Sequence, residues 1–302
     1  MSPLPRDPVV LTGASGFVGR VVRARLPDAR ALSLAGPDWR DRLAAASFAG
    51  ARVIHLGARV HEPSGDEARF HEDNAVKTRA LAEAAARGGA SRLVIASTVK
   101  VFGEESPGRA FRESDEPRPE DAYARSKRAA ELGATEVAEA ARLPVAILRI
   151  PLVWGPGVGA NFRALISLCA RGVPLPFASI ANRRSLVHVD DLAEALVLAA
   201  FHDAAPGRAW CVAHPEPVAT PGLVTAIRRA LDMPVRLIPF PVALLETIAG
   251  LAGRGAVVRR LTRSLEVDTE PFVSSLGWRP TRTPATDMAD TVRAWRTAGA
   301  PS

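Results

Sequence analysis

Thr12-Gly13-Ala14-Ser15-Gly16-Phe17-Val18-Gly19 decides the fold of this chain. The segment follows an apolar, strand-like run and leads into an apolar, helix-like run. A glycine-rich turn between a strand and a helix is where doubly wound α/β proteins cradle a dinucleotide pyrophosphate. Gly13 allows the tight turn, Gly16 lets the backbone approach phosphate, and Gly19 allows close packing of helix on sheet. The helix N-terminus then points free N–H groups at the phosphates.

A second segment, Tyr123-Ala124-Arg125-Ser126-Lys127, carries candidate chemistry. The spacing of Tyr123 and Lys127 places a phenol and an ammonium on one helix face. Because a nearby positive charge favours phenolate, we expect Lys127 to lower the pKa of Tyr123 and make the phenol a usable acid/base. Either segment alone can be a tight loop or a solvated helix face. Together, in this order, they predict hydride chemistry at a carbon that bears oxygen.

The composition fits an enzyme better than a nucleic-acid-binding protein. A chain of 302 residues with 47% hydrophobic content can form a large α/β domain and a smaller lobe. The formal net charge is +7, but arginines are interleaved with acidic residues and no aromatic-rich ribbon offers bases a stacking surface. We therefore expect no nucleic acid partner. The basic character suits a nucleotide diphosphate.

Several features bear on location and on metals. Cys169 and Cys211 have no metal-ligand spacing and form no disulfide framework, so we expect no metal site. The first residues lack the apolar core of a signal peptide, which predicts a cytoplasmic protein. The most apolar stretch, 235–251, is interrupted by prolines and a glutamate, so we expect no membrane span. Packing in the second lobe is favoured for it, with a dimer face or a membrane surface as alternatives.

The alternation of short β-branched runs with alanine- and leucine-rich segments predicts an α/β fold, a Rossmann-type doubly wound parallel sheet with a smaller C-terminal α/β substrate lobe. Residues 1–155 are expected to form the dinucleotide-binding domain, with 184–201 returning to it. Residues 156–302 are expected to form mainly the substrate-binding lobe. The predicted strands are 8–11, 31–34, 52–56, 92–96, 145–150 and one near 210–212. The predicted helices are 17–26, 39–47, 66–87, 120–141, 161–171 and 190–200.

The sequence offers few residues that could bind the adenosine half of the cofactor. Little chain separates Gly19 from His55, so the second strand, its helix and a third strand are cramped or partly absent. No carboxylate follows the second strand to bind a ribose 2′-hydroxyl, as NAD-selective sites usually require. Asp38 lies slightly later and could serve an adenosine contact, whereas Arg40 or Arg42 could meet a 2′-phosphate. The cofactor is therefore NAD or NADP, with the choice left open.

The chain resembles the extended short-chain dehydrogenases/reductases, in the branch of nucleotide-sugar epimerases and dehydratases. The resemblance runs from residue 11 to about 280 and therefore covers nearly the whole chain. Besides the two segments above, it is carried by Val53–Ala58, Asn74–Thr78, Ser97–Gly103, Leu148–Pro156, Arg184–Asp191 and Leu276–Pro280.

The resemblance implies roles for individual residues. Tyr123 matches the catalytic acid/base, Lys127 the lysine that binds the nicotinamide ribose, and Thr98 the catalytic hydroxyl that bonds the reacting oxygen of the substrate. The residues expected to contact the cofactor are Gly13, Ser15, Gly16, Phe17, Val18, Asp38, Leu56, Gly57, Ala58, Asn74, Tyr123, Lys127 and Pro151. The residues expected to contact the substrate are Lys100, Asn161 and Arg184.

Departures from the family pattern narrow the reaction. Sugar 4,6-dehydratases place Asp-Glu where this chain has Val99 and Lys100, so the proton carriers for water elimination are missing. The stretch 97–104, with Lys100 before its glycine and Glu104 after it, resembles the same stretch in family members that are 4-epimerases or reductases of 4-keto sugars. We therefore expect NAD(P)-dependent hydride transfer at C4 of the hexose of a nucleotide-diphosphate sugar. The resemblance further implies that this sugar is UDP-linked and that the enzyme is a homodimer. The alternatives are reduction of a non-sugar carbonyl and a non-catalytic dinucleotide-binding redox sensor.

Overall fold

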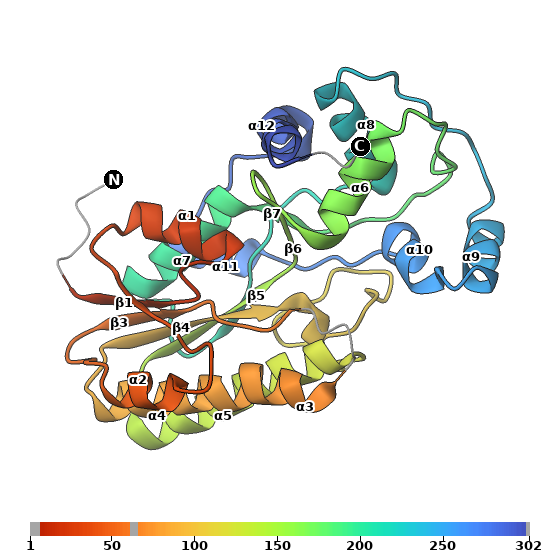
Figure 1. Cartoon of the computed structure of the whole chain (residues 1–302). Helices are drawn as coiled ribbons and strands as arrows, with labels where there is room; N and C mark the ends of the chain where they lie inside the picture. The colour runs from red at the N-terminus through yellow and green to blue at the C-terminus, as the bar shows by residue number, and fades with distance from the viewer. Residues whose placement is uncertain (1–6, 61–65, 300–302) are drawn as a thin grey trace.

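A parallel sheet forms the centre of the protein. The computed structural model describes residues 7–60 and 66–299 (Figure 1). The six-stranded sheet has the order β2-β1-β3-β4-β5-β8 and every neighbouring pair is parallel. Its strands are β1 (Val9–Thr12), β2 (Arg30–Leu32), β3 (Arg52–His55), β4 (Arg92–Thr98), β5 (Val145–Ile150) and β8 (Ala209–Cys211). The predicted doubly wound parallel sheet is thus confirmed.

Helices cover both faces of this sheet, as Figure 1 shows. One face carries α1 (Phe17–Arg25) and α7 (Val189–Phe201). The other carries α2 (Trp39–Ala44), α3 (Glu67–Phe70), α4 (Lys77–Arg87) and α5 (Ala122–Ala141). Because both faces are covered, the central strands are buried on both sides and read in the sequence as continuous apolar runs. Every residue of β1 and of β5 is buried.

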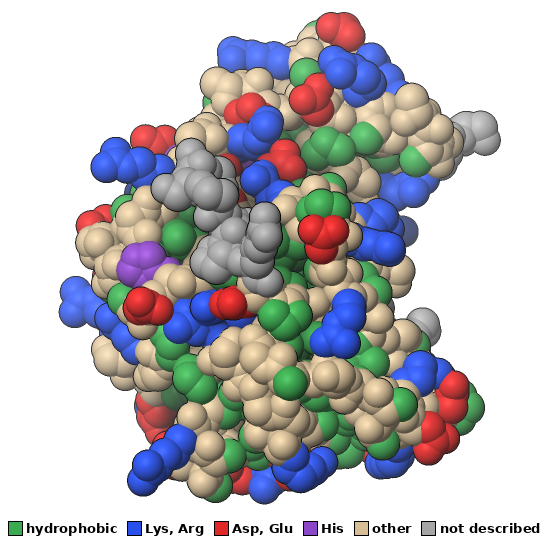
Figure 2. Space-filling model, turned by 90° about the vertical axis from the view of Figure 1, so that its left-hand side faces the viewer, with side chains coloured by type: hydrophobic (Ala, Val, Ile, Leu, Met, Phe, Trp, Pro, Cys, Tyr) green, Lys and Arg blue, Asp and Glu red, His purple; other side chains and the backbone are tan. Residues whose placement is uncertain are grey.

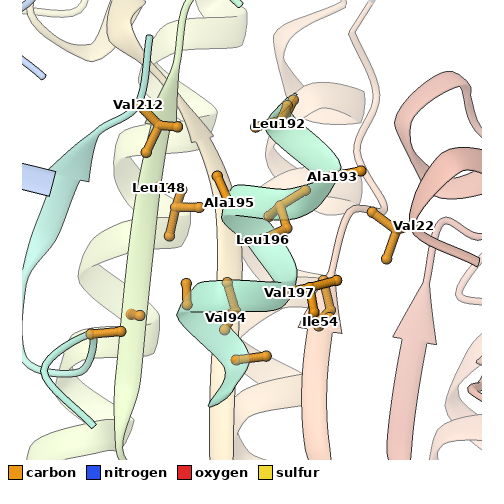
Figure 3. Close-up of a cluster of buried hydrophobic side chains, with 14 of the residues drawn as sticks. Val22, Ile54, Val94, Leu148, Leu192, Ala193, Ala195, Leu196, Val197 and Val212 are labelled. Carbon is orange, nitrogen blue, oxygen red and sulfur yellow. The ribbon is translucent and has the colours of Figure 1, made fainter. Parts of the chain in front are cut away.

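The helix α7 forms the centre of one core layer. Figure 3 shows its side chains between strand residues such as Ile54, Val94 and Leu148 and the helix residue Val22. Leu192 and Leu196 fill the space over the sheet, and alanines beside them let α7 approach it closely. A late segment of the chain therefore packs on strands built from the first half. The division into domains 1–155 and 156–302 stays a prediction.

The remaining elements build a smaller part at the carboxyl side of the sheet. Two short parallel strands, β6 (Leu152–Trp154) and β7 (Leu186–His188), form a second sheet. A short 3₁₀ turn, η2 (Val99–Val101), follows β4. The helices of this part are α6 (Ala160–Ala170), α8 (Thr220–Ala230), α9 (Val242–Leu251), α10 (Gly255–Thr262) and α12 (Pro284–Thr297). The helix α11 (Glu270–Leu276) instead packs against the core layer of α7 through Phe272 and Leu276. Trp154, Phe162 and Val224 belong to the core that joins α6, α8 and α12.

The strand order reverses at β1, because β2 lies on one side of this first strand and β3 lies on the other. In the described part of the chain only β2, three residues long, lies beyond β1. The cramped segment after Gly19 thus takes the form expected from its length. Ligands of open α/β sheets bind outside the carboxyl ends of the strands at such a reversal.

The apolar stretch 235–251 does not pack as expected. Most of its residues are half-buried or exposed, and Ala249 alone is buried in α9. The expectation that the stretch packs in the second lobe is therefore wrong for most of its side chains. No helix in residues 7–60 and 66–299 is long and apolar enough to cross a membrane. On the face drawn in Figure 2, lysine and arginine side chains are interspersed with acidic ones.

Candidate active site

The glycine-rich turn has a shape that other residues could not adopt. Gly13 has a φ of +69°, and a Cβ at this position would lie 2.7 Å from the backbone nitrogen of Gly57. A Cβ at Gly19 would lie 2.0 Å from the carbonyl oxygen of Gly13. The Gly16 amide donates to the same oxygen at 3.0 Å. The turn is therefore pressed between the end of β3 and the first turn of α1.

A pocket of about 680 Å³ opens where β1, β2 and β3 end. Six of the predicted cofactor residues line it, namely Gly13, Ser15, Gly16, Leu56, Gly57 and Ala58. Ser15 and Gly16 are exposed at the N-terminus of α1, so the backbone there faces the pocket with the positive end of the helix dipole. The volume lies in the range of cofactor sites, and these residues fit a dinucleotide pyrophosphate.

The other lining residues include several that the sequence did not single out, among them Arg23, Arg59, Asp73 and Lys77. Asp73 accepts a hydrogen bond from Arg59 at 2.6 Å and one from Lys77 at 2.5 Å. The carboxylate in the pocket is thus neutralised by two cations. The Arg59–Asp73 contact joins segments that are distant in sequence, and Asp73 and Lys77 lie one helical turn apart. No sequence motif predicts either contact.

The predicted adenosine contacts are engaged elsewhere. Asp38 does not line the pocket and forms an ion pair with Arg42, whose hydrogen bond lowers the pKa of the carboxyl. The Arg42 Nε donates to the Ser33 carbonyl at 2.9 Å. Arg40 stacks on the Trp39 ring at 4.2 Å and pairs with Glu72. Asp38, Arg40 and Arg42 are thus each engaged within the protein, so the contact predicted for Asp38 requires breaking its ion pair.

Asn74 holds two parts of the site together. Its side-chain oxygen accepts from the Arg59 amide at 2.7 Å, and its nitrogen donates to the Arg59 carbonyl and to the Ser126 hydroxyl, each at 2.9 Å. The loop after β3 is thereby tied to α5. Phe17, Val18 and Pro151 also lie outside the pocket lining, the first two in the first turn of α1 and Pro151 directly after β5.

The three predicted catalytic residues come from two adjoining elements. Thr98 is the last residue of β4, Tyr123 lies in the first turn of α5, and Lys127 follows one turn later. The Lys127 side chain is buried and its Nζ donates to the Ala96 carbonyl of β4 at 2.6 Å. Burial lowers the pKa of Lys127 to about 8. The ring of Phe70 lies edge-on to Tyr123, with centroids 6.2 Å apart.

The expected lowering of the pKa of Tyr123 by Lys127 is wrong for this arrangement. Burial raises the pKa of the phenol to about 12, with a second contribution from the negative charge of Asp121, while a hydrogen bond with Thr98 opposes them. Desolvation outweighs the hydrogen bond because an ionised phenol loses its hydration in this position. The phenol is therefore neutral at physiological pH.

Beside the phenol lies a cluster of opposite charges. The Lys100 ammonium binds Asp121 at 2.5 Å and also Glu104. Asp121 caps α5 by accepting from the Ala124 amide at 2.7 Å. Lys100 was a predicted substrate contact, whereas Asp121 and Glu104 were not predicted in any role at the site. The position of Asp121, two residues before Tyr123 at a helix start, is the one signal that could have identified it.

The two remaining predicted substrate residues differ in their surroundings. The half-buried Arg184 donates to the Arg263 carbonyl at 3.0 Å. Burial lowers the pKa of its guanidinium, the charge of Glu104 raises it, and the charge of Arg260 lowers it. Arg263, whose carbonyl accepts the hydrogen bond from Arg184, also pairs with Glu105 at 3.6 Å, so Arg184 lies near the loop that carries Glu104 and Glu105. Asn161 is exposed in the first turn of α6.

A buried histidine supports the floor of the site. The His55 Nδ1 lies 2.6 Å from the Thr12 hydroxyl and its Nε2 2.9 Å from the Thr78 hydroxyl. Burial, with the charge of Lys127 as a second cause, lowers the pKa of His55 to about 3. The ring is therefore a neutral connector between the end of β1, the end of β3 and α4.

The sequence profile of the NAD dependent epimerase/dehydratase family matches residues 9–213, which hold the turn, the pocket and the Thr98, Tyr123 and Lys127 cluster. The chain belongs to this family. The UDP-glucose 4-epimerase of Vibrio cholerae is 35% identical over 249 residues, covering 80% of this chain and 76% of that protein. A dTDP-6-deoxy-L-talose 4-dehydrogenase of Kitasatospora kifunensis is 28% identical over 311 residues, covering 91% of each.

Solved structures agree in fold. The UDP-glucose 4-epimerase of Thermus thermophilus in complex with NAD has a TM-score of 0.75 and 20% identity, covering 96% of this chain and 99% of that one. Membership of the family confirms the predicted extended short-chain dehydrogenase/reductase branch, the enzyme class and a nicotinamide dinucleotide as cofactor. It leaves the choice between NAD and NADP open.

Proposed function

We propose that the protein transfers a hydride at C4 of the hexose of a UDP-linked sugar, as a 4-epimerase or a 4-keto-sugar reductase. The observation that carries this proposal is the position of Thr98, Tyr123 and Lys127 at the carboxyl end of β4 and the start of α5. They adjoin the strand ends that border the glycine-rich pocket. A sugar carbon between the phenol and a cofactor in that pocket can exchange a proton on one side and a hydride on the other.

Tyr123 is the group that moves the proton. In the reducing direction the neutral phenol donates its proton to the C4 oxygen. In the oxidising direction the phenol would take the proton of the C4 hydroxyl as phenolate, a form that the positive charges of Lys127 and of bound NAD+ would favour. Thr98 hydrogen-bonds the phenol and holds the reacting oxygen in line with it. Lys127, held by the Ala96 carbonyl, can carry a positive charge near neutral pH because its pKa is about 8. When bound, NAD(P) supplies hydride acceptance and donation.

The cofactor would be held mainly by backbone. Amides at the N-terminus of α1, from Ser15 to Val18, would bind the pyrophosphate, with Gly13 and Phe17 shaping the turn. Leu56, Gly57 and Ala58 would line the opposite wall. Asn74 would act by fixing that wall to α5, and Pro151 would close the nicotinamide end after β5. Asp38 would reach the adenosine only after release from Arg42.

The diphosphate of the substrate would be held by residues of the C-terminal part, 156–302, with Arg184 as its main contact. A partly desolvated guanidinium gains more from a phosphate than an exposed one does, and its planar fork can pair with two oxygens. Asn161 would add a hydrogen bond from α6. Lys100, already paired with Asp121 and Glu104, would face the sugar.

Two observations favour different outcomes of the same chemistry. The similarity to the Vibrio cholerae 4-epimerase supports epimerisation, which would need one cofactor to stay bound through both half-reactions. The single short strand beyond β1 and the engaged Asp38 support weak adenosine binding and cofactor exchange, which suits a reductase. The predicted homodimer and the cytoplasmic location stay predictions.

Product analysis tests the proposal. The protein is incubated with UDP-glucose or UDP-galactose without added cofactor, and with a UDP-4-keto hexose plus NADH or NADPH. Interconversion in the first arm identifies an epimerase, and reduction in the second identifies a reductase. Tyr123→Phe is expected to lower either rate by about two to four orders of magnitude. Turnover of non-sugar ketones alone, or near-normal turnover by Tyr123→Phe, would contradict the proposal.

A further inference from the structure

The outer side of the α9–α10 helix pair carries an exposed apolar surface. Leu244, Ile248 and Leu251 recur at helical spacing on α9 and are 47%, 51% and 87% exposed. Val257 of α10 is 54% exposed. In Figure 1 the two helices lie side by side at the right-hand edge of the molecule, away from β1 and α1. We call Leu244, Ile248, Leu251 and Val257 the α9–α10 face.

The α9–α10 face is held in place from behind. Val242 and Leu245 of α9 pack against the apolar core that includes α6 and α8. Between the two helices, the Glu246 carboxylate accepts hydrogen bonds from Arg263 at 2.7 and 2.9 Å and from the Thr262 hydroxyl at 2.5 Å. The exposure of the outer residues is therefore a property of a fixed helix pair. Large exposed apolar side chains that lie together usually mark an interaction surface.

Two exposed arginines flank Val257 in this face. Glu246 is the one acidic residue between 233 and 263. In the described part of the chain no carboxylate lies within ion-pair distance of Arg254 or Arg260, which are exposed and lie three residues to either side of Val257. Arg259 lies close enough to Glu246 for its charge to lower the pKa of that carboxyl. By contrast, Arg79 on the sheet-covering helix α4 pairs with Glu83 and Glu136. The α9–α10 face thus combines apolar side chains with positive charges that have no internal partner.

We infer that the α9–α10 face docks on an anionic lipid surface. Helices with apolar side chains on one side and arginines at its border lie in the plane of a membrane, with the apolar groups at the headgroup–acyl boundary and the cations on lipid phosphates. A second copy fits less well, because a symmetric contact would oppose the same arginines. The inference does not depend on the reaction proposed for Tyr123.

Vesicle flotation of the full chain tests the inference. The protein is expected to float with vesicles of phosphatidylcholine and phosphatidylglycerol, to float little with pure phosphatidylcholine, and to dissociate as salt rises. Ile248→Ser combined with Leu251→Ser should lower the partition coefficient at least tenfold, at about 0.8 kcal/mol per withdrawn methylene. Val173→Ser, at a residue 49% exposed in the same part of the chain, is the matched control and should leave it unchanged.

Substitution of the arginines distinguishes binding to lipid phosphates from purely apolar binding to the vesicle. Arg254→Gln and Arg260→Gln should each lower the partition coefficient about fivefold, the value of one cation near an anionic surface. Arg293→Gln on α12 is the matched control and should have no such effect. Circular dichroism checks that each variant is folded. Equal flotation with neutral vesicles, or no flotation, would overturn the inference. A dimer that Ile248→Ser dissociates, without vesicle binding, would assign the face to a second copy.

Discussion

Tyr123 is the single tyrosine of the chain, so its ionisation can be measured without interference from other phenols. The expected midpoint in the free protein is about 12, against an ordinary value of 10.0, because burial and the charge of Asp121 both oppose the phenolate. A shift of two units corresponds to at most about 2.7 kcal/mol. The unfolded chain ionises first, so this part of the folding free energy is lost as pH rises from 10 through 12.

The assay is a rapid pH jump followed by near-ultraviolet tyrosinate absorbance, read before unfolding. Circular dichroism under the same conditions shows whether the fold persists. Tyr123→Phe should remove the whole signal. Asp121→Asn keeps an N-cap acceptor for the Ala124 amide but removes the charge, and should lower the midpoint.

Two results would refute this reasoning. A midpoint near the ordinary value in a protein that is still folded would show that the phenol is not desolvated. An unchanged midpoint in Asp121→Asn would remove Asp121 as an electrostatic partner. A fall of the midpoint on addition of NAD+ would in turn support the proposed site, because the oxidised nicotinamide ring is positively charged and a positive charge near the phenol favours phenolate.

Three further predictions concern stability. Glu131→Ala leaves the buried Arg149 without its carboxylate and should lower the free energy of unfolding by about 3–5 kcal/mol. Glu136→Ala breaks an exposed ion pair and should lower it by less than about 1 kcal/mol. Equal losses in denaturant unfolding would contradict this prediction. Gly19→Ala should abolish NAD(P) binding in calorimetry or prevent folding, because a Cβ there collides with the Gly13 carbonyl. Gly250→Ala adds a methyl group in open space and should leave binding unchanged. A Gly19→Ala variant that still binds NAD(P) would show that the backbone of the turn can move. The pKa of His55 is about 3 in the folded protein, against an ordinary value of 6.5. Below pH 6.5 the unfolded chain binds a proton that the folded protein does not, so the free energy of unfolding should fall by roughly 1.4 kcal/mol per pH unit. A free energy of unfolding that does not change with pH in this range would show that the ring is in contact with water.

The parallel sheet could be predicted from the sequence because its strands are buried on both faces. The run Val145–Ile150 has the predicted bounds, and the other sheet strands differ at their ends. The segment 66–87, predicted as one helix, contains a π-helical stretch at His71–Val76, which apolar periodicity does not signal. A strand after Arg184 was expected and is β7, but its pairing with β6 was not predicted, because the two short strands lie far apart in the sequence.

The site was predictable where a motif fixes local geometry and unpredictable where contacts join distant segments. The spacing of Tyr123 and Lys127 predicted their common helix face, but only the fold reveals how deeply both are buried, and burial reverses the expected pKa shift of the phenol. The pairing of Lys100 with Asp121 likewise depends on β4 and α5 lying together. Sequence spacing gives neighbours along one element, while electrostatics depends on neighbours across elements.

The shortness of the sheet beyond β1 bears on the choice between epimerase and reductase. The adenosine side of the pocket is made by residues 31–36 and Arg23, and Asp38 is already paired with Arg42. A missing carboxylate–ribose hydrogen bond lowers affinity by about 1.5–3 kcal/mol, or one to two decades. The cofactor should then exchange with solvent and show modest discrimination between NADH and NADPH. Purified protein that retains one NAD per chain would contradict weak adenosine binding and would favour the epimerase, because that reaction needs the same cofactor for both half-reactions.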